Sequence, residues 1–230
     1  MEQLRRVGII GGMGALACAD LFYKVISCTN ACCDNDHIPL LIDNNTQIPD
    51  RTAHILKGGI SPLPMLIQSA KRLKDGGCDA IAISCNTAHY FADDILKVVD
   101  IELLHIAKIA VNTIVKEHKD TKKVAVIATD GTKKARIYDD ILESYGYESV
   151  FIDEINQKNI MSCIYDGAKA GKIKEFTPLF KDVLMSVEAD VYIAACTEIP
   201  LFLPYIDEKY KFIDATLELA KEIVRFSLNK

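Results

Sequence analysis

The chain has 230 residues, of which 50% are hydrophobic and 26% are charged, and its formal net charge is −5. An apolar fraction of this size can form a folded core and excludes disorder as the main state. The negative charge argues against a partner that is a nucleic acid or an anionic membrane surface.

Short runs rich in valine and isoleucine alternate with longer amphipathic stretches along the chain. Apolar runs of this kind are typical of strands buried on both faces, and their alternation with helices is typical of a parallel α/β sheet. The predicted strands span 7–10, 38–42, 80–83, 124–128, 149–152 and 191–195, with shorter ones at 103–104 and 211–213. The predicted helices span 15–27, 64–74, 91–98, 107–116, 134–144, 157–169, 178–186 and 215–227.

The sequence does not begin like a secretory signal, because only a short apolar run precedes the first glycine pair. No stretch approaches the roughly 18 apolar residues that a membrane span needs. We therefore expect a cytoplasmic protein, whose eight cysteines are thiols rather than a disulfide framework.

An internal repeat surrounds two of these cysteines. Asp79 begins an apolar run and is followed six positions later by Cys85, and Asp190 begins a similar run and is followed six positions later by Cys196. Earlier in each half, a predicted strand leads into a turn that contains glycine. A duplication of this length is too long for a solenoid unit and indicates two similar α/β halves.

The repeat predicts two parallel-sheet α/β domains related by a pseudo-two-fold axis. The first domain is expected to comprise residues 1–100 and 208–230, and the second residues 101–207. Ligands of open parallel sheets bind beyond the carboxyl ends of the strands. We therefore expect an active site in the cleft between the domains, with one repeated cysteine on each side.

Two thiols at one site suit several kinds of chemistry. A zinc site would need further ligands, for which His89 and Glu198 are candidates, and no Cys-x-x-Cys redox motif is present. A thiolate and a thiol also form a base and an acid, since a helix N-terminus lowers a thiol pKa from its usual ~8.5. One could remove a proton from carbon while the other protonates the opposite face, which is racemisation or epimerisation. The alternative is that both cysteines are small buried side chains.

Four segments carry a family resemblance: Gly11-Gly12-Met13-Gly14, Ile48-Pro49-Asp50-Arg51-Thr52, Ser84-Cys85-Asn86-Thr87-Ala88-His89 and Ala195-Cys196-Thr197-Glu198-Ile199-Pro200. Together they resemble the aspartate/glutamate racemase family, and in particular its aspartate racemases. Glutamate racemases of this family instead share an Asp-Ser-Gly start and a Cys-Thr-His second motif. The resemblance implies a homodimeric, cofactor-independent racemase that needs no metal and uses Cys85 and Cys196 as its two bases.

The resemblance also implies a set of substrate-binding side chains. Arg51 is expected to meet the side-chain carboxylate of the substrate, with Lys169 as a second cation, although such residues are usually solvated surface cations. The polar residues after the cysteines could bind the α-carboxylate or simply cap helices. The remaining expected binding residues are Met13, Asn86, Thr87, Thr129, Thr197 and Glu198.

Three other patterns have competing interpretations. His89 lies one helical turn after Cys85 and could orient the thiol or be structural. Residues 12–17 also match the dinucleotide fingerprint G-x-G-x-x-A, which leaves the cysteine repeat unexplained. Cys28, Cys32 and Cys33 look like part of a metal cluster, but we interpret them as buried thiols at a helix end, and the other cysteines as core.

These observations predict an amino-acid racemase for aspartate that works without pyridoxal phosphate. A racemase for glutamate or for a broader amino-acid set is the first alternative. A cysteine-based isomerase or decarboxylase of dicarboxylates is the second. The non-enzymatic alternative is a small-anion sensor, for which both cysteines would be dispensable.

Overall fold

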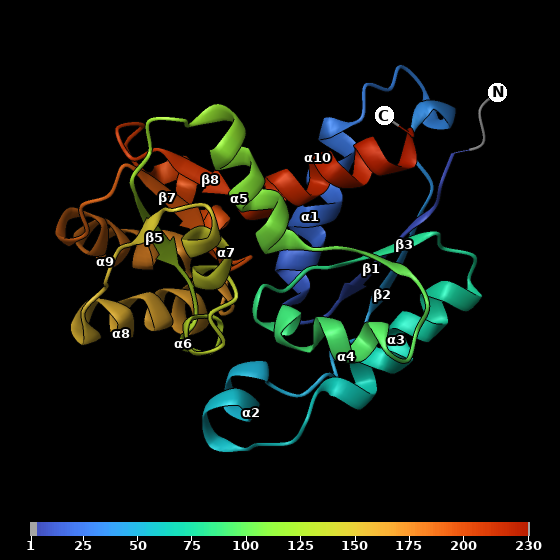
Figure 1. Cartoon of the computed structure of the whole chain (residues 1–230), viewed down its shortest axis with the longest axis horizontal. Coiled ribbons are helices and arrows are strands. Elements are labelled where there is room, and N and C mark those ends of the chain that lie inside the picture. The colour runs from blue at the N-terminus through green and yellow to red at the C-terminus, as the bar shows by residue number, and fades with distance from the viewer. Residues whose placement is uncertain (1–3, 230) are drawn as a thin grey trace.

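The computed structural model describes residues 4–229, and within them eight strands form two parallel sheets flanked by helices (Figure 1). The first sheet contains β1 (Val7–Gly11), β2 (Leu40–Asn44), β3 (Ala80–Ile83) and β4 (Glu102–Leu104). The second contains β5 (Lys123–Ile127), β6 (Glu148–Ser149), β7 (Val191–Ala194) and β8 (Phe212–Asp214).

The two sheets have the same strand order. The first runs β2-β1-β3-β4 and the second β6-β5-β7-β8, with every recorded pairing parallel. β1 therefore corresponds to β5, and β3 to β7. The α/β fold with two similar halves, predicted from the repeat, is confirmed.

Helices connect the strands and cover the sheets. The α-helices are α1 (Ala15–Cys28), α2 (Arg51–Lys57), α3 (Leu63–Asp75), α4 (Ala92–Leu96), α5 (Ile106–Glu117), α6 (Asp130–Lys134), α7 (Asp139–Ser144), α8 (Glu154–Ser162), α9 (Ile173–Ser186) and α10 (Ala215–Ser227). Three-ten helices are η1 (Asp34–Asp36), η2 (Thr87–Phe91) and η4 (Ile199–Tyr205), and η3 (Cys163–Ala168) is a π-helical turn.

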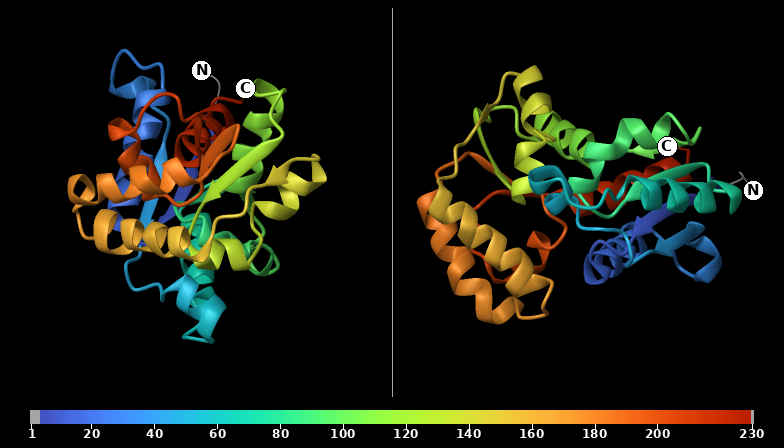
Figure 2. Two further views of the ribbon diagram at one scale, coloured as in Figure 1. Left: turned by 90° about the vertical axis from the view of Figure 1, so that its left-hand side faces the viewer. Right: turned by 90° about the horizontal axis from the view of Figure 1, so that it is seen from below.

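A shared hydrophobic core joins the halves. It combines residues of β1 and β3 with residues of β5 and β7, and with α1, α5 and α10. Two further clusters each lie within one half. Figure 2 shows the two halves side by side in its right-hand view. Because apolar side chains from both sheets are buried together, the halves hold each other in a defined relative position.

The edge strands β4 and β8 each lie on the other side of a predicted domain boundary from the sheet that they join. β4 pairs with β3 of the first sheet, although it lies just beyond residue 100. β8 pairs with β7 of the second sheet, although it lies within 208–230. Within that C-terminal segment, α10 packs against α1 of the first half. The division at these residues stays a prediction.

Two local predictions were wrong. Of the helix expected over 134–144, only the part from Asp139 forms, as α7, because Arg136 has a left-handed φ of 51° that separates it from α6. Cys32 and Cys33 are exposed and Cys28 is half-buried, so the three are not the buried thiols that we expected. Helix α2 was not expected. It starts because the Asp50 carboxylate caps it at the Ala53 amide, 2.6 Å away.

None of the helices within residues 4–229 is long and apolar enough to cross a membrane.

Candidate active site

A small cavity lies between the two halves, beyond the carboxyl ends of β1, β3, β5 and β7. The volume that the centre of a water molecule can reach in it is about 10 Å³, which leaves room for about one water molecule. The ten residues expected at the site all line this cavity: Met13, Arg51, Cys85, Asn86, Thr87, Thr129, Lys169, Cys196, Thr197 and Glu198. Thr52 and Tyr165 also line it.

Cys85 follows β3, and its backbone is held by His89. The imidazole Nδ1 donates a hydrogen bond to the Cys85 carbonyl at 3.0 Å, and Nε2 accepts one from the Ile106 amide at 3.3 Å. Burial, and then the charge of His105, lowers the pKa of His89 to about 3, so the ring is neutral at physiological pH. His89 thus fixes the Cys85 backbone through two backbone contacts, as a structural histidine does.

Arg51 begins α2 and points into the cavity. Its Nη2 donates to the Met13 carbonyl at 2.9 Å and its Nη1 to the Pro49 carbonyl at 3.0 Å, while Nε has no recorded partner. Burial lowers the pKa of Arg51, but the neighbouring Cys85 and Asp50 raise it, and the net direction is upward. The side chain is therefore a buried cation beside the first cysteine.

Cys196 follows β7 and is tied to a carboxylate. Its Sγ donates to Oε2 of Glu198 at 3.0 Å, and Oε1 of Glu198 accepts from the Lys169 ammonium at 2.8 Å. Burial and then the negative charge of Glu198 raise the pKa of Cys196 well above its usual value. Cys196 is therefore a thiol in this state, whereas Cys85 faces Arg51.

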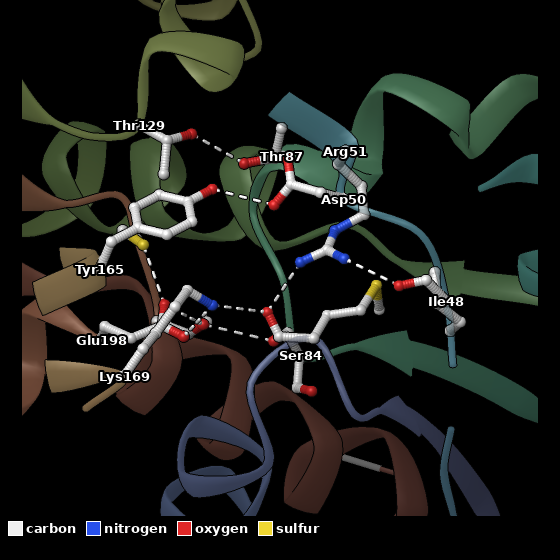
Figure 3. A network of polar contacts seen from close by, with 12 residues as sticks. Ile48, Asp50, Arg51, Ser84, Thr87, Thr129, Tyr165, Lys169 and Glu198 are labelled. Carbon is white, nitrogen blue, oxygen red and sulfur yellow. Dashed lines mark hydrogen bonds and ion pairs between the residues drawn. The ribbon is translucent and has the colours of Figure 1, made fainter. Parts of the chain in front are cut away.

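The two cations converge on one oxygen. Lys169 donates to the Met13 carbonyl at 3.0 Å, the same atom that accepts from Arg51. Figure 3 shows Arg51 and Lys169 pointing toward each other across the site. Burial lowers the pKa of Lys169, but Glu198 and the two cysteines raise it, with a net upward direction. The cavity thus contains two positive charges, of which Glu198 neutralises one.

Hydroxyl groups bring the two halves together beside the cysteines. Thr87 Oγ1 lies 2.9 Å from Oγ1 of Thr129 and 2.9 Å from Oγ1 of Thr132. Thr197 donates to the Ser84 carbonyl at 3.3 Å. These contacts cross from one half to the other, so they set the spacing between the Cys85 and Cys196 sides of the cavity.

Asn86 has a buried donor without a partner. Its Oδ1 accepts a hydrogen bond from the Tyr138 hydroxyl, which fixes the orientation of the amide. Its Nδ2 is buried and has no recorded partner. A buried donor without a partner is costly. A ligand oxygen in the cavity would satisfy the Asn86 Nδ2 group, and Arg51 Nε offers a second such donor.

The glycines of the first turn serve internal packing. Gly12 has a φ of 85°, and a side chain there would meet the backbone of Asn45. A Cβ at Gly14 would lie 2.7 Å from Oε1 of Glu198. The glycines therefore let the chain approach protein groups, so the fingerprint over residues 12–17 has an explanation without a dinucleotide.

The zinc site considered from the sequence would need a cluster of metal-binding side chains. No three His, Cys, Asp or Glu side chains within residues 4–229 are grouped closely enough to hold a metal ion. His89, one of the two added ligands that a zinc site would use, has both ring nitrogens engaged with backbone groups.

Sequence reasoning missed Tyr165 and Thr52. Tyr165 lies in the π-helical turn η3 and donates to Oδ2 of Asp50 at 3.0 Å, across the two halves. Burial, and then the charge of Asp50, raises the pKa of Tyr165 to about 12. No motif marks Tyr165, because a π turn has no clear signature. Thr52 directly follows Arg51 and could have been included on that basis.

Comparisons with known proteins agree on one family. The sequence profile described as Asp/Glu/hydantoin racemase matches residues 10–223. The aspartate racemase of Picrophilus torridus has a similar structure, with a TM-score of 0.86 and 29% identity over 97% of this chain and 94% of that one. The broad-specificity amino-acid racemase RacX of Bacillus subtilis is 30% identical over 69% of each chain. Glutamate racemase isoform RacE1 of Bacillus anthracis shares the fold, with a TM-score of 0.70 and 18% identity over 100% of this chain and 83% of that one.

Proposed function

The chain belongs to the Asp/Glu/hydantoin racemase family, and we propose that it interconverts L- and D-aspartate with Cys85 and Cys196 as its two bases. One observation carries the proposal. The two cysteines follow equivalent strands, β3 and β7, of two similar halves, and both line one cavity. An α-carbon between them would face one thiol group on each side.

The reaction follows from this arrangement. One cysteine, as the thiolate, takes the α-proton, so the C–H bond breaks and its electron pair stays on the α-carbon, next to the carboxylate. The other cysteine, as the thiol, delivers its proton to the opposite face, so a new C–H bond forms. The pair then holds the same number of protons with their positions exchanged. Positioned acids and bases of this kind contribute roughly 10²–10⁴-fold each.

The polar groups divide between the two carboxylates of the substrate. The free Nδ2 of Asn86 and the hydroxyls of Thr87 and Thr129 lie next to the cysteines and suit the α-carboxylate. Arg51 and Lys169 converge on the Met13 carbonyl, and two cations there suit the distal carboxylate. A dicarboxylic amino acid satisfies both groups at once.

One similarity favours aspartate as the substrate: the likeness to the Picrophilus torridus aspartate racemase covers nearly the whole chain. The similarity to the Bacillus subtilis racemase supports a second candidate, a racemase that accepts a broader amino-acid set. The assay described next also distinguishes a racemase from a dicarboxylate isomerase, a decarboxylase and a sensor.

The test is an incubation of the purified protein with L-aspartate in deuterated buffer, with no cofactor added. Racemisation by two bases yields D-aspartate that carries α-deuterium, whereas a decarboxylase yields a different product and a sensor yields none. Parallel reactions with glutamate and alanine separate aspartate specificity from a broader range. Absence of D-aspartate at a protein concentration equal to that of the substrate would refute the proposal.

Two further expectations accompany this function. We expect a cytoplasmic homodimer. Light scattering would measure the mass of the assembly. We also expect that dialysis against a chelator leaves activity unchanged and that the protein carries no flavin, nicotinamide or pyridoxal absorbance. Loss of activity on chelation that a metal restores would favour the zinc interpretation.

A further inference from the structure

Glu198 sits between Cys196 and Lys169 in the cavity. Its side chain is 4% exposed. One carboxylate oxygen accepts from the Lys169 ammonium at 2.8 Å, and the other accepts from the Cys196 thiol at 3.0 Å and the Thr197 hydroxyl at 3.3 Å. The carboxylate thus connects the second cysteine to one of the two cations.

Lys169 is the cation that a distal carboxylate would share with Arg51. In the structure its recorded polar partners are Glu198 and the Met13 carbonyl. The free space in the cavity is roughly that of one water molecule, so a four-carbon substrate cannot enter while these groups keep their positions. A second carboxylate at Lys169 would also repel Glu198, because like charges at one buried site disfavour each other.

We infer that Glu198 is an internal competitor for Lys169, occupying the cation until the distal carboxylate of a substrate displaces it, and that it meanwhile accepts the hydrogen bond of the Cys196 thiol. The inference rests on the proposed function for the identity of the substrate. It makes Glu198 a positioning residue, which acts on the reaction through Lys169 and Cys196.

Competition for Lys169 affects specificity. A ligand whose only carboxylate is held by the groups beside the cysteines has none left for Lys169, so it leaves the Lys169–Glu198 pair intact and the cavity closed. A dicarboxylate replaces that pair with its own. The competition therefore reduces affinity for every dicarboxylate, but it restricts opening of the site to ligands that carry a second carboxylate.

The first measurement is the binding of succinate, a dicarboxylate without an α-amino group, by calorimetry at neutral pH. Glu198→Gln keeps the size of the side chain but removes the charge that pairs with Lys169. We expect this variant to bind succinate about tenfold more tightly than the unaltered protein, within the range usual for residues in direct contact. Equal or weaker binding of succinate by the variant overturns the inference. Propionate, with one carboxylate, should show less than a twofold difference, and a tenfold gain for propionate would also overturn it.

A double-mutant cycle separates competition from a general effect of charge. In a Lys169→Met background, Glu198→Gln should give a clearly smaller gain in succinate affinity, because only the repulsion between Glu198 and the succinate carboxylate is left to relieve. A gain of the same size in both backgrounds would mean that Glu198 repels anions without competing for Lys169. The matched control is Asp20→Asn, which removes a partly buried carboxylate that pairs with Lys24 and does not line the cavity. We expect this variant to bind succinate within twofold of the unaltered protein.

Kinetics with aspartate give two changes, in KM and in the pH profile of kcat, that partial unfolding of the variant would not produce. Glu198→Gln should lower KM, because Lys169 is free, and should move the alkaline limb of the kcat profile to lower pH, because the charge that keeps Cys196 protonated is gone. Glu198→Asp retains the charge and should restore that limb. An unmoved limb in Glu198→Gln counts against the inference. If the unaltered protein racemises nothing, the proposed function fails, but the succinate cycle still decides whether Glu198 competes for Lys169.

Discussion

The hydroxyl of Thr87 lies 2.9 Å from the hydroxyl of Thr129, and the two residues come from opposite halves of the chain. Thr87 begins the turn after Cys85, and Thr129 caps α6 at the end of β5. The contact is possible because the chain next to Thr129 carries no side chain at Gly131, which lies against Thr52 and Thr87. The spacing of the two halves at the site therefore depends on Gly131, the glycine of the turn that follows the predicted strand 124–128.

Gly131→Ala should reduce activity without unfolding the protein. The new Cβ would lie 2.7 Å from Thr52 Oγ1 and 3.0 Å from Thr52 Cα, and that backbone atom cannot move freely. We expect the halves to separate slightly and kcat/KM on aspartate to fall about 10²-fold, since misplacements of about 1 Å have such effects. Activity and thermal unfolding are measured together.

The matched control for that variant is Gly59→Ala. A Cβ at Gly59 would make ordinary contacts of 3.4 Å or longer and needs no left-handed backbone. It should keep kcat/KM within about twofold, as surface substitutions without a special role do. If Gly131→Ala is as active as Gly59→Ala, the Thr87–Thr129 contact does not determine the geometry of the site.

Replacing either cysteine tests the two-base reaction. Cys85→Ala or Cys196→Ala should lower racemisation by at least roughly 10²–10⁴-fold, because each removes an acid or base from one face of the α-carbon. The double variant should be little worse than either single one, since one proton path needs both groups. Family resemblance suggests that Cys196 serves the L enantiomer and Cys85 the D enantiomer. A single variant with unchanged activity would end the two-base assignment.

The fold could be predicted because its signals are local and repeated. Each strand is an apolar run, and the duplicated Asp-strand-Cys pattern marks equivalent strands, so two similar parallel-sheet halves were accessible from sequence, although the strand order within each sheet was not. The division of the helix at Arg136 was not, because a left-handed residue other than glycine has no reliable signal. Cys32 and Cys33 are exposed because they lie in the irregular segment between α1 and η1, whose path hydrophobic periodicity does not encode.

The site was partly accessible for a related reason. Strand ends locate Cys85 and Cys196, and family resemblance locates Arg51. Neither source indicates that Glu198 pairs with Lys169, or that Tyr165 bonds Asp50, because both contacts join segments far apart in the chain. The substrate-binding roles of Arg51, Lys169 and Glu198 stay predictions.

Arg51→Met should lower kcat/KM on aspartate by roughly 1.5–3 kcal/mol of lost charge-assisted binding, about 10- to 100-fold. Steady-state kinetics with aspartate measure the loss, and succinate binding should weaken by a similar factor because succinate also carries two carboxylates. Arg51→Lys should recover little, since an ammonium does not reproduce the planar donor geometry. An unchanged kcat/KM in Arg51→Met would remove Arg51 from the distal site.

The pH dependence of kcat should be bell-shaped, because the reaction needs one thiolate and one thiol at the same time. The pKa of Cys196 is raised by burial and then by Glu198, so the loss of its proton, and the alkaline limb, should lie above the usual thiol value of ~8.5. A rate profile from pH 6 to 11 measures both limbs. A profile without an alkaline limb would mean that no thiol donates a proton.

Stability should fall on acidification through His89. Burial, and then His105, lowers the His89 pKa from 6.5 to about 3 in the folded protein, so the unfolded chain binds the proton more tightly. The contribution of His89 is complete above pH 6.5 and is lost as the pH falls toward 3. One such group changes the free energy of unfolding by about 1.4 kcal/mol per pH unit, or about 2 kcal/mol between pH 6.5 and 5, where carboxylates still titrate little.

Urea unfolding between pH 6.5 and 5 measures this slope in the unaltered protein, in His89→Gln and in the control His118→Gln, whose side chain reaches solvent. His89→Gln should reduce the slope by about 1.4 kcal/mol per pH unit even if it lowers stability at pH 7.5, because glutamine takes up no proton, whereas His105, whose pKa burial lowers to about 4, supplies slope that remains. A slope that is the same in all three proteins would mean that His89 is not the buried neutral group that fixes the Cys85 backbone.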